Sequence, residues 1–533
     1  MIIKKIVWLA AAALLAATSA QAQVRLSCTP PVDHATRAES ESYSLREPTK
    51  FDPQKLYRQP VVLISFNDRD FSMPDPKSYY HRLFNEQGFN SGKGLGCMAD
   101  YFRDQSSGRI NLQFDIYGPI KVDQSAVKIS FSNYGESAMR AASNQLCETE
   151  SADFSIYDWD GDGKVNQVVY VAAGFCGNQV RGYIWPNSAY SFEKLPGGIR
   201  NDFYSISSEL WKDGTLNGIG TIAHEFCHCL GLPDFYPMSS ATPFSVVDEW
   251  DLMDGGNLTN KGWCPPNFTT IEKMYLGWEQ PEELTSPTTV TGMKPLSEGG
   301  KSYIVRNSGN PDEYYLLENR RQTGWDYGIP SNGLLIYHVN FDLKAWRNNS
   351  MNVSDGAFRY DLFHADGKNY LDWDPNNDGN DPNKYTMPDC LRSSYLSTSP
   401  YPYANPATIT ANDSLTDVSA PAATLFNAAA DGRMLMGKSI TNIRLADDGT
   451  ISFDFMKGPE TGITTTQAPE GTDAWYTLDG RRLTGRPAAK GLYIRRPATG
   501  QSRVTLVRYV QAPVHSRTAT RLICSGWNFV NNI

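Results

Sequence analysis

Histidine is scarce in this chain, and basic residues are not in excess. Only 7 of the 533 residues are histidine, so two histidines at a defined spacing are informative. The 49 lysines and arginines are outnumbered by 58 aspartates and glutamates, which leaves a net charge of −9. Without a basic excess, the chain is not expected to bind nucleic acid. Beyond residue 22, no apolar run is long enough to cross a membrane.

Cysteine is present in an odd number, nine, so disulfides within the chain cannot include all of them. Cys227 and Cys229 flank a histidine, but on a helix they point about 100° to either side of it. We therefore predict that both are small packing residues rather than metal ligands. Cys28 could cap a metal ion in a latent form, because a thiolate binds zinc well, with a disulfide or a free thiol as the alternatives.

The start of the chain predicts export. Lys4 and Lys5 precede an apolar run at 6–17, which is followed by the small-x-small sequence AQA at 20–22. The apolar run is too short to span a membrane. We therefore predict that residues 1–22 are a signal peptide and that the protein is secreted or displayed at the cell surface.

A chain of this length is too long for one compact core, so two to four domains are expected. Residues 23–58 are polar and aperiodic, which predicts an N-terminal extension or a pro-segment. Strand and helix patterns interleave over 59–285, whereas 286–457 is dominated by strand patterns, so we expect an α/β part followed by a β-rich part. A linker rich in Thr, Gly and Pro follows at 458–469, and 470–533 predicts a small β module with an irregular tail.

One stretch, HEFCHCLGLPD, has the spacing of a metal site. His224 and His228 stand four apart on a predicted helix, so both imidazoles project from one face and can reach one ion. Glu225 places a carboxylate beside that ion, where it can hold a water. Gly231 can end the helix with a positive φ, and the returning chain then offers Asp234 as a third ligand. Such a set leaves the fourth position of zinc open, as a catalytic site requires.

Three more residues are candidates near this site. Glu249 is the alternative third ligand, because it also follows the helix as a carboxylate. Met253 lies in a turn closed by glycines and is predicted to form an apolar floor beneath the histidines. His338, near the end of a predicted strand, is a candidate for a group that supports a ligand or binds the transition state; a structural histidine is the alternative.

Acidic residues alternate along two loops, a pattern that suits a hard cation such as calcium. The first loop differs from an EF-hand, because an EF-hand needs a flanking helix and a Glu at loop position twelve, which here is Val169. The alternative for both loops is a solvated acidic turn. The predicted calcium ligands are Asp158, Asp160 and Asp162 in the first loop and Asp372, Asp374 and Asp378 in the second.

Several blocks of the chain match one known family in order. They include MADYFRDQSSGRINL at 98–112, DFSIYDWDGDGKVNQVVYVAAG at 153–174, the metal stretch within 220–236, 250–257, 271–281, 313–340 and 412–455. Together these blocks span roughly residues 58–457 and resemble the immune inhibitor A family of secreted zinc metalloproteases. Two positions depart from the family pattern, Cys227 where a small residue is usual and Asn340 where an acid is common.

This resemblance implies a metzincin-like zinc endopeptidase of α/β (α+β) class, with the protease core at 59–285 and a β-rich continuation of the protease region at 286–457. It implies protein or peptide substrates, cleaved by a zinc-activated water with Glu225 as general base. The alternative is an inactive surface-binding or adhesion module that keeps the fold, but such a protein has no need to retain Glu225. Residues 475–494 resemble, more distantly, the C-terminal β segments of exported Bacteroidetes-type proteins, which implies a sorting role.

Overall fold

The computed structural model describes a large part of the chain, which separates into two compact units, 1–458 and 459–533. The predicted signal peptide, the extension up to residue 44, Cys28, the linker 458–469 and the tail 508–533 lie outside the described residues. Within the described part, no helix is both long enough and apolar enough for a membrane span. The described residues are 45, 47–127, 135–177, 180–191, 193–237, 245–352, 358–373, 394–404, 411–457, 474–476, 482–483, 491–496 and 503–507.

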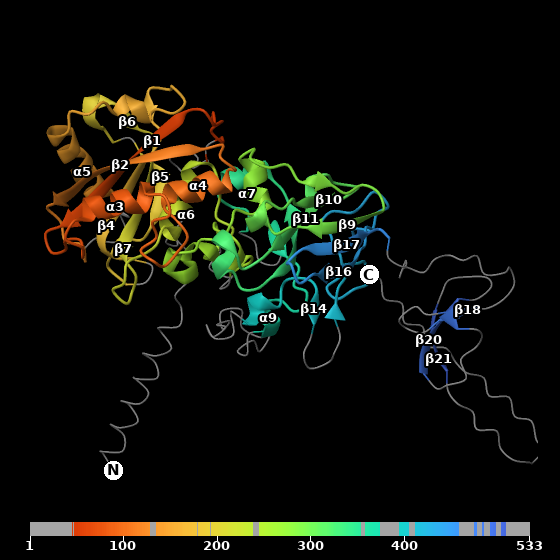
Figure 1. Ribbon diagram of the computed structural model, residues 1–533. Helices are drawn as coiled ribbons and strands as arrows, with labels where there is room; N and C mark the ends of the chain where they lie inside the picture. The colour runs from red at the N-terminus through yellow and green to blue at the C-terminus, as the bar shows by residue number, and fades with distance from the viewer. Residues whose placement is uncertain are drawn as a thin grey trace, which may run out of the picture. The chain divides into compact units, whose positions relative to one another are not determined.

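A five-stranded sheet organises the first half of the larger unit (Figure 1). Its strand order is β2-β1-β4-β7-β5. β1 pairs in parallel with β2 and β4, β4 pairs in parallel with β7, and β5 runs antiparallel to β7 at one edge. The strands are β1 Leu56–Phe66, β2 Asn111–Val122, β4 Val168–Phe175, β5 Asn187–Tyr190 and β7 Phe203–Leu210.

Helices pack on both faces of this sheet. Val61 and Leu63 of β1 belong to a core shared with α3, α4 and α6, whereas Val62 and Ile64 belong to a second core shared with α5. Successive side chains of a strand point to opposite faces, so a strand buried on both faces reads as one continuous apolar run. The helices are α3 Pro76–Asn85, α4 Met98–Gln105, α5 Glu136–Thr149, α6 Gly220–Cys229 and α7 Thr270–Tyr275.

Local sequence signals set several helix starts. Asp75 caps α3 by accepting a hydrogen bond of 3.0 Å from the Ser78 amide. Thr269 and Glu272 form a capping box at the start of α7. The short remaining elements of this half are η1 Phe154–Tyr157, β3 Lys164–Val165, η2 Pro196–Gly198, β6 Arg200–Asn201, η3 Asp248–Trp250 and η4 Gly255–Gly262.

The second half of the larger unit is rich in strands. One sheet has the order β13-β12-β11-β10-β8 and another the order β16-β17-β9. Leu316 and Leu335 of the first of these sheets join the core that also contains Phe226 of α6, while Leu317 and Ile336 face a separate core. The two halves therefore share one core. The elements are β8 Glu282–Glu283, β9 Thr288–Met293, η5 Leu296–Glu298, β10 Tyr303–Arg306, β11 Glu313–Arg320, η6 Gly324–Gly328, β12 Gly333–Asn340, α8 Leu343–Arg347, β13 Tyr360–Leu362, α9 Tyr370–Trp373, β14 Tyr403–Ala404, β15 Ala411–Asn412, β16 Ile440–Leu445 and β17 Ile451–Phe455.

The smaller unit contains a four-stranded antiparallel sheet of order β19-β18-β20-β21. Its strands fall in the part of the chain where a small β module is predicted. The strands are β18 Ala474–Tyr476, β19 Arg482–Leu483, β20 Gly491–Arg496 and β21 Arg503–Val507. The protein is thus mixed α/β with several sheets, as the sequence predicts at this level.

Candidate metal centre

Helix α6 carries both motif histidines and is buried over its whole length. It has no side-chain cap at its N-terminus, so packing holds it in place. A Cβ at Gly220 would collide with the Asn257 carbonyl oxygen, and one at Gly218 would collide with the Gly262 carbonyl oxygen. These two glycines therefore allow η4 to approach the start of the helix closely.

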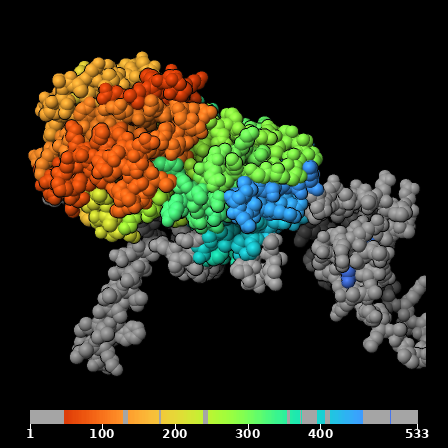
Figure 2. Space-filling model, in the orientation of Figure 1, coloured from red at the N-terminus to blue at the C-terminus, as the bar shows by residue number. Residues whose placement is uncertain are grey.

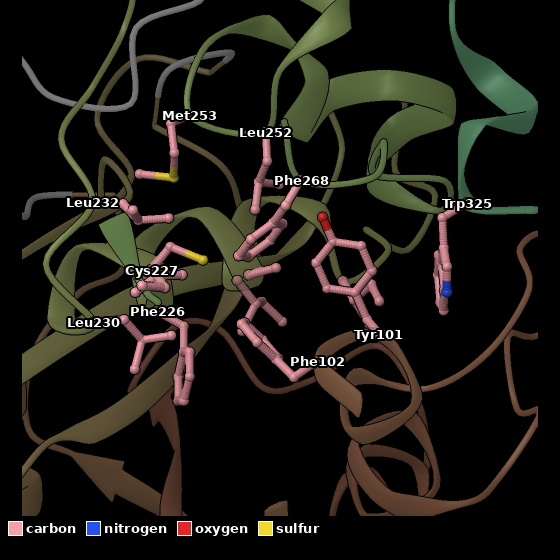
Figure 3. Close-up of a cluster of buried hydrophobic side chains, with 14 of the residues drawn as sticks. Tyr101, Phe102, Phe226, Cys227, Leu230, Leu232, Leu252, Met253, Phe268 and Trp325 are labelled. Atoms are coloured by element: carbon pink, nitrogen blue, oxygen red, sulfur yellow. The ribbon is translucent and has the colours of Figure 1, made fainter. Parts of the chain in front are cut away.

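An apolar cluster packs against α6 and fixes its orientation (Figure 3). Phe226 lies with its ring centroid 4.8 Å from that of Phe102 on α4. Cys227 is fully buried in the same cluster, and burial raises the pKa of its thiol well above the usual range. Cys229 is also buried. Within the described residues, neither cysteine joins a metal-binding group, which agrees with the predicted packing role.

Gly231 ends the helix as the sequence predicts. Its φ is +98°, a conformation that glycine adopts without strain. The Leu232 amide then donates to the Cys227 carbonyl at 3.1 Å, the hydrogen bond that defines a Schellman turn. This turn sends the chain back along the helix end and brings Asp234 to the two histidines.

Three ligand atoms converge at this point. The Nε2 atoms of His224 and His228 lie 3.1 and 3.3 Å from Oδ1 of Asp234. All three side chains are buried, and among the described residues none of these three atoms has a hydrogen-bond partner. A buried polar atom without a partner costs about 1–3 kcal/mol. Three such atoms directed at one another fit the donor set of a metal ion.

Backbone carbonyls orient both imidazoles. Nδ1 of His224 donates to the Leu252 carbonyl at 2.9 Å, and Nδ1 of His228 donates to the Leu232 carbonyl at 2.8 Å. Because a carbonyl can only accept, each ring carries a proton on Nδ1, which leaves Nε2 as the nitrogen that can bind a metal. Burial alone would lower the pKa of His228, but the Asp234 carboxylate outweighs it and raises that pKa to about 9.

Asp234 is held by a residue that the sequence does not single out. Its second carboxylate oxygen, Oδ2, accepts from Nδ2 of Asn349 at 2.7 Å, and its backbone amide donates to Oδ1 of Asn349 at 2.6 Å. Asn349 follows α8, 115 positions along the chain. No local pattern in this stretch could have indicated the contact.

The structure also describes the other residues that the sequence predicts around the histidines. Glu225 is fully buried on α6, beside His224. Met253 is buried in the turn after η3, and its carbonyl accepts from the Phe235 amide at 2.9 Å. Glu249, the alternative third ligand, is absent from the group of described residues that meets here, whereas Asp234 is part of it.

His338 lies in the strand-rich half. Its Nε2 is 2.7 Å from Oε1 of Glu313, and its ring stacks on Phe426 at 4.5 Å between centroids. Among the described residues it does not belong to the metal-binding group. These contacts are those of a structural histidine, the alternative given above. The role of His338 in supporting a ligand or binding the transition state stays a prediction.

The first acidic loop brings its carboxylates together, with ligand atoms of Asp158, Asp160 and Asp162 within 4.8 Å of one another. Asp158 also accepts from the amides of Gly161 and Gly163, and such bonds hold an acidic turn without an ion. Calcium at this loop therefore stays a prediction.

The second acidic loop is described only at its start. Asp372 is exposed and accepts from the Asn369 amide at 2.9 Å, at the start of α9. Asp374 and Asp378 lie outside the described residues. The calcium site predicted for this loop therefore also stays a prediction.

A separate pocket of about 810 Å³ is lined by α4 and by segments of the second half, and none of the three converging side chains lines it. Trp325, one of its lining residues, packs against Tyr101 of α4 at 4.9 Å between ring centroids. Surfaces of the two halves meet in this region, as Figure 2 shows where orange adjoins green. The pocket is therefore not part of the metal centre.

Comparison with known proteins defines the class. Residues 197–280 match the immune inhibitor A peptidase M6 catalytic domain, and this stretch contains all of α6 together with Asp234. Over this stretch the chain is similar to the catalytic domain of metalloproteases of the immune inhibitor A type, and this match supports a metalloprotease of that type.

Two curated relatives carry the same description. They are the pre-pro-metalloproteases PrtV of Vibrio cholerae serotype O1, strains M66-2 and ATCC 39315 / El Tor Inaba N16961. Each is 22% identical over 244 residues, which covers 38% of this chain and 26% of the relative. The chain thus matches about a quarter of the length of these relatives.

Proposed function

We propose that the protein is an exported zinc-dependent endopeptidase whose zinc is held by His224, His228 and Asp234. The convergence of three buried ligand atoms that have no hydrogen-bond partner among the described residues carries this proposal. Two imidazole nitrogens and one carboxylate oxygen suit zinc and leave a position open for substrate or water. Zinc bound there would supply Lewis acidity, polarising the scissile carbonyl and lowering the pKa of a water.

Glu225 is the proposed general base. It follows His224 directly on α6, so its carboxylate lies on the helix that presents the ligands. Glu225 is fully buried, and burying a carboxylate costs free energy unless it is paired or hydrogen-bonded. There it takes a proton from the attacking water and returns it to the leaving amine. An inactive binding module would have no use for this carboxylate, and that alternative is not favoured.

Chelation tests the proposal directly. The purified protein should clear casein in a zymogram, lose that activity with a chelator and regain it with added zinc. His224→Ala should lose both bound metal and casein cleavage, because one of three ligands is removed. Cleavage that persists in the chelator, or in His224→Ala at the wild-type rate, would contradict the proposed centre.

A further inference from the structure

We propose that Asn349 is a positioning residue for the metal centre: its side-chain amide fixes the Asp234 carboxylate so that Oδ1 faces both imidazoles. This inference rests on the proposed function, because it assumes that Asp234 binds the metal. It adds a residue from the strand-rich half of the unit, outside the stretch 197–280 that matches the catalytic domain.

The argument begins with the two hydrogen bonds between these residues. One amide group contacts Asp234 twice, accepting from its backbone N–H at 2.6 Å and donating to its Oδ2 at 2.7 Å. The paired bonds close a ring that restricts rotation of the carboxylate. With Oδ2 occupied, Oδ1 is the oxygen left to face His224 and His228, at 3.1 and 3.3 Å from their Nε2 atoms. Partners that orient a ligand in this way raise metal affinity.

Asn349 is itself held firmly. Its φ is +51°, a left-handed conformation that asparagine tolerates better than most residues. The backbone amide of Asn349 donates to the Trp346 carbonyl at 3.1 Å, and Nε1 of Trp346 donates to the Gly231 carbonyl at 2.9 Å. The end of α8 is thus fixed both to the turn after α6 and to the third ligand. A rigid partner of this kind can hold the carboxylate before any metal arrives.

A neighbouring asparagine provides a matched control. Asn352 is also buried, and its amide makes three backbone hydrogen bonds, donating to the carbonyls of Phe235 and Tyr360 and accepting from the Tyr360 amide. It therefore ties the same loop to the residue after Asp234, but it does not touch the carboxylate. Removing its side chain should lower stability without turning the ligand.

The experiment measures the zinc dissociation constant by chelator competition, in the whole protein carrying each substitution. Asn349→Gly removes the amide and accepts the positive φ, whereas Asn349→Asp keeps the shape but replaces the donor by a like charge. Both should weaken zinc binding by about 10–100-fold. Asn352→Ala should lower the melting temperature yet change zinc affinity by less than about threefold.

Three outcomes would overturn the proposal. Zinc affinity within about twofold of wild type in both Asn349 variants would show that the amide does not position the ligand. An equal loss of affinity in Asn352→Ala would show a general effect of loop stability instead. Failure of the wild-type protein to bind zinc would refute the metal centre itself. If the wild type binds zinc and both Asn349 variants bind it equally well, only the positioning role is refuted.

Discussion

At the scale of single residues, the convergence of the three proposed metal ligands could be predicted because its geometry is local. The helical period places His224 and His228 on one face, and the positive φ of Gly231 returns the chain to bring in Asp234. Asn349 could not be predicted, because its contact with Asp234 joins segments 115 positions apart. Local spacing thus accounts for the ligands, whereas the residue that orients one of them depends on the tertiary fold.

Asp251 gives a pH-dependent prediction at the same scale. Burial, together with the neighbouring Asp254 and Glu318 carboxylates, raises its pKa from 3.8 to about 7. Between these two values the folded state holds a proton that the unfolded chain has released. The free energy of unfolding should therefore fall as pH rises through this window.

Asp251→Asn should remove this pH dependence, because the asparagine side chain is neutral at every pH. Its oxygen can still accept from the backbone amide of Met253, which lies 2.7 Å from Oδ1 of Asp251. The unfolding free energy of the variant minus that of wild type should increase by roughly 2 kcal/mol as the pH rises from about 5 to 8. Urea unfolding at several pH values measures this. Asp70→Asn, at an exposed carboxyl, is the control, and parallel curves for wild type and Asp251→Asn would contradict the prediction.

At the scale of elements, periodicity predicts strands and helices well but not their partners. The continuous apolar run of β1 and the capping box of α7 are local signals. The approach of η4 to the start of α6 depends instead on two glycines facing carbonyl oxygens from a later segment. A sequence pattern shows the glycines but not what lies against them.

Gly220→Ala should test this packing. The added methyl group would collide with the Asn257 carbonyl oxygen, so α6 and η4 must separate, and we expect a loss of about 3 kcal/mol in unfolding free energy. Denaturant unfolding measures it. Gly214→Ala is the control, because it has a φ of +79° with open space around it and should lose only about 1 kcal/mol. Equal losses would show that steric contact at α6 is not the cause.

At the scale of the whole molecule, the sequence predicts a protease core at 59–285 and a β-rich continuation of the protease region at 286–457. In the larger unit the two halves share one core, since Phe226 and Phe268 cluster with Leu335, Tyr337 and Trp346. The change from helix to strand patterns near residue 286 therefore marks a change of secondary structure. It does not mark the edge of a core.

Truncation tests this shared core. A chain that ends at residue 285 loses Asn349 and one side of the core, so it should be insoluble or unfolded and should bind zinc weakly. A chain that ends at residue 458 keeps the larger unit and should fold and bind zinc like the full protein. Soluble yield, circular dichroism and zinc content distinguish the two. A shorter chain that is folded and loaded with zinc would contradict a shared core.

The central claim is that this group of residues holds zinc and that Glu225 performs the chemistry beside it. Its most direct test is one preparation of Glu225→Ala, assayed for bound zinc and for casein cleavage. The three ligands remain in this variant, so we predict wild-type zinc content with cleavage reduced by about 10²–10⁴-fold. Cleavage near the wild-type rate in the zinc-loaded variant would contradict the account.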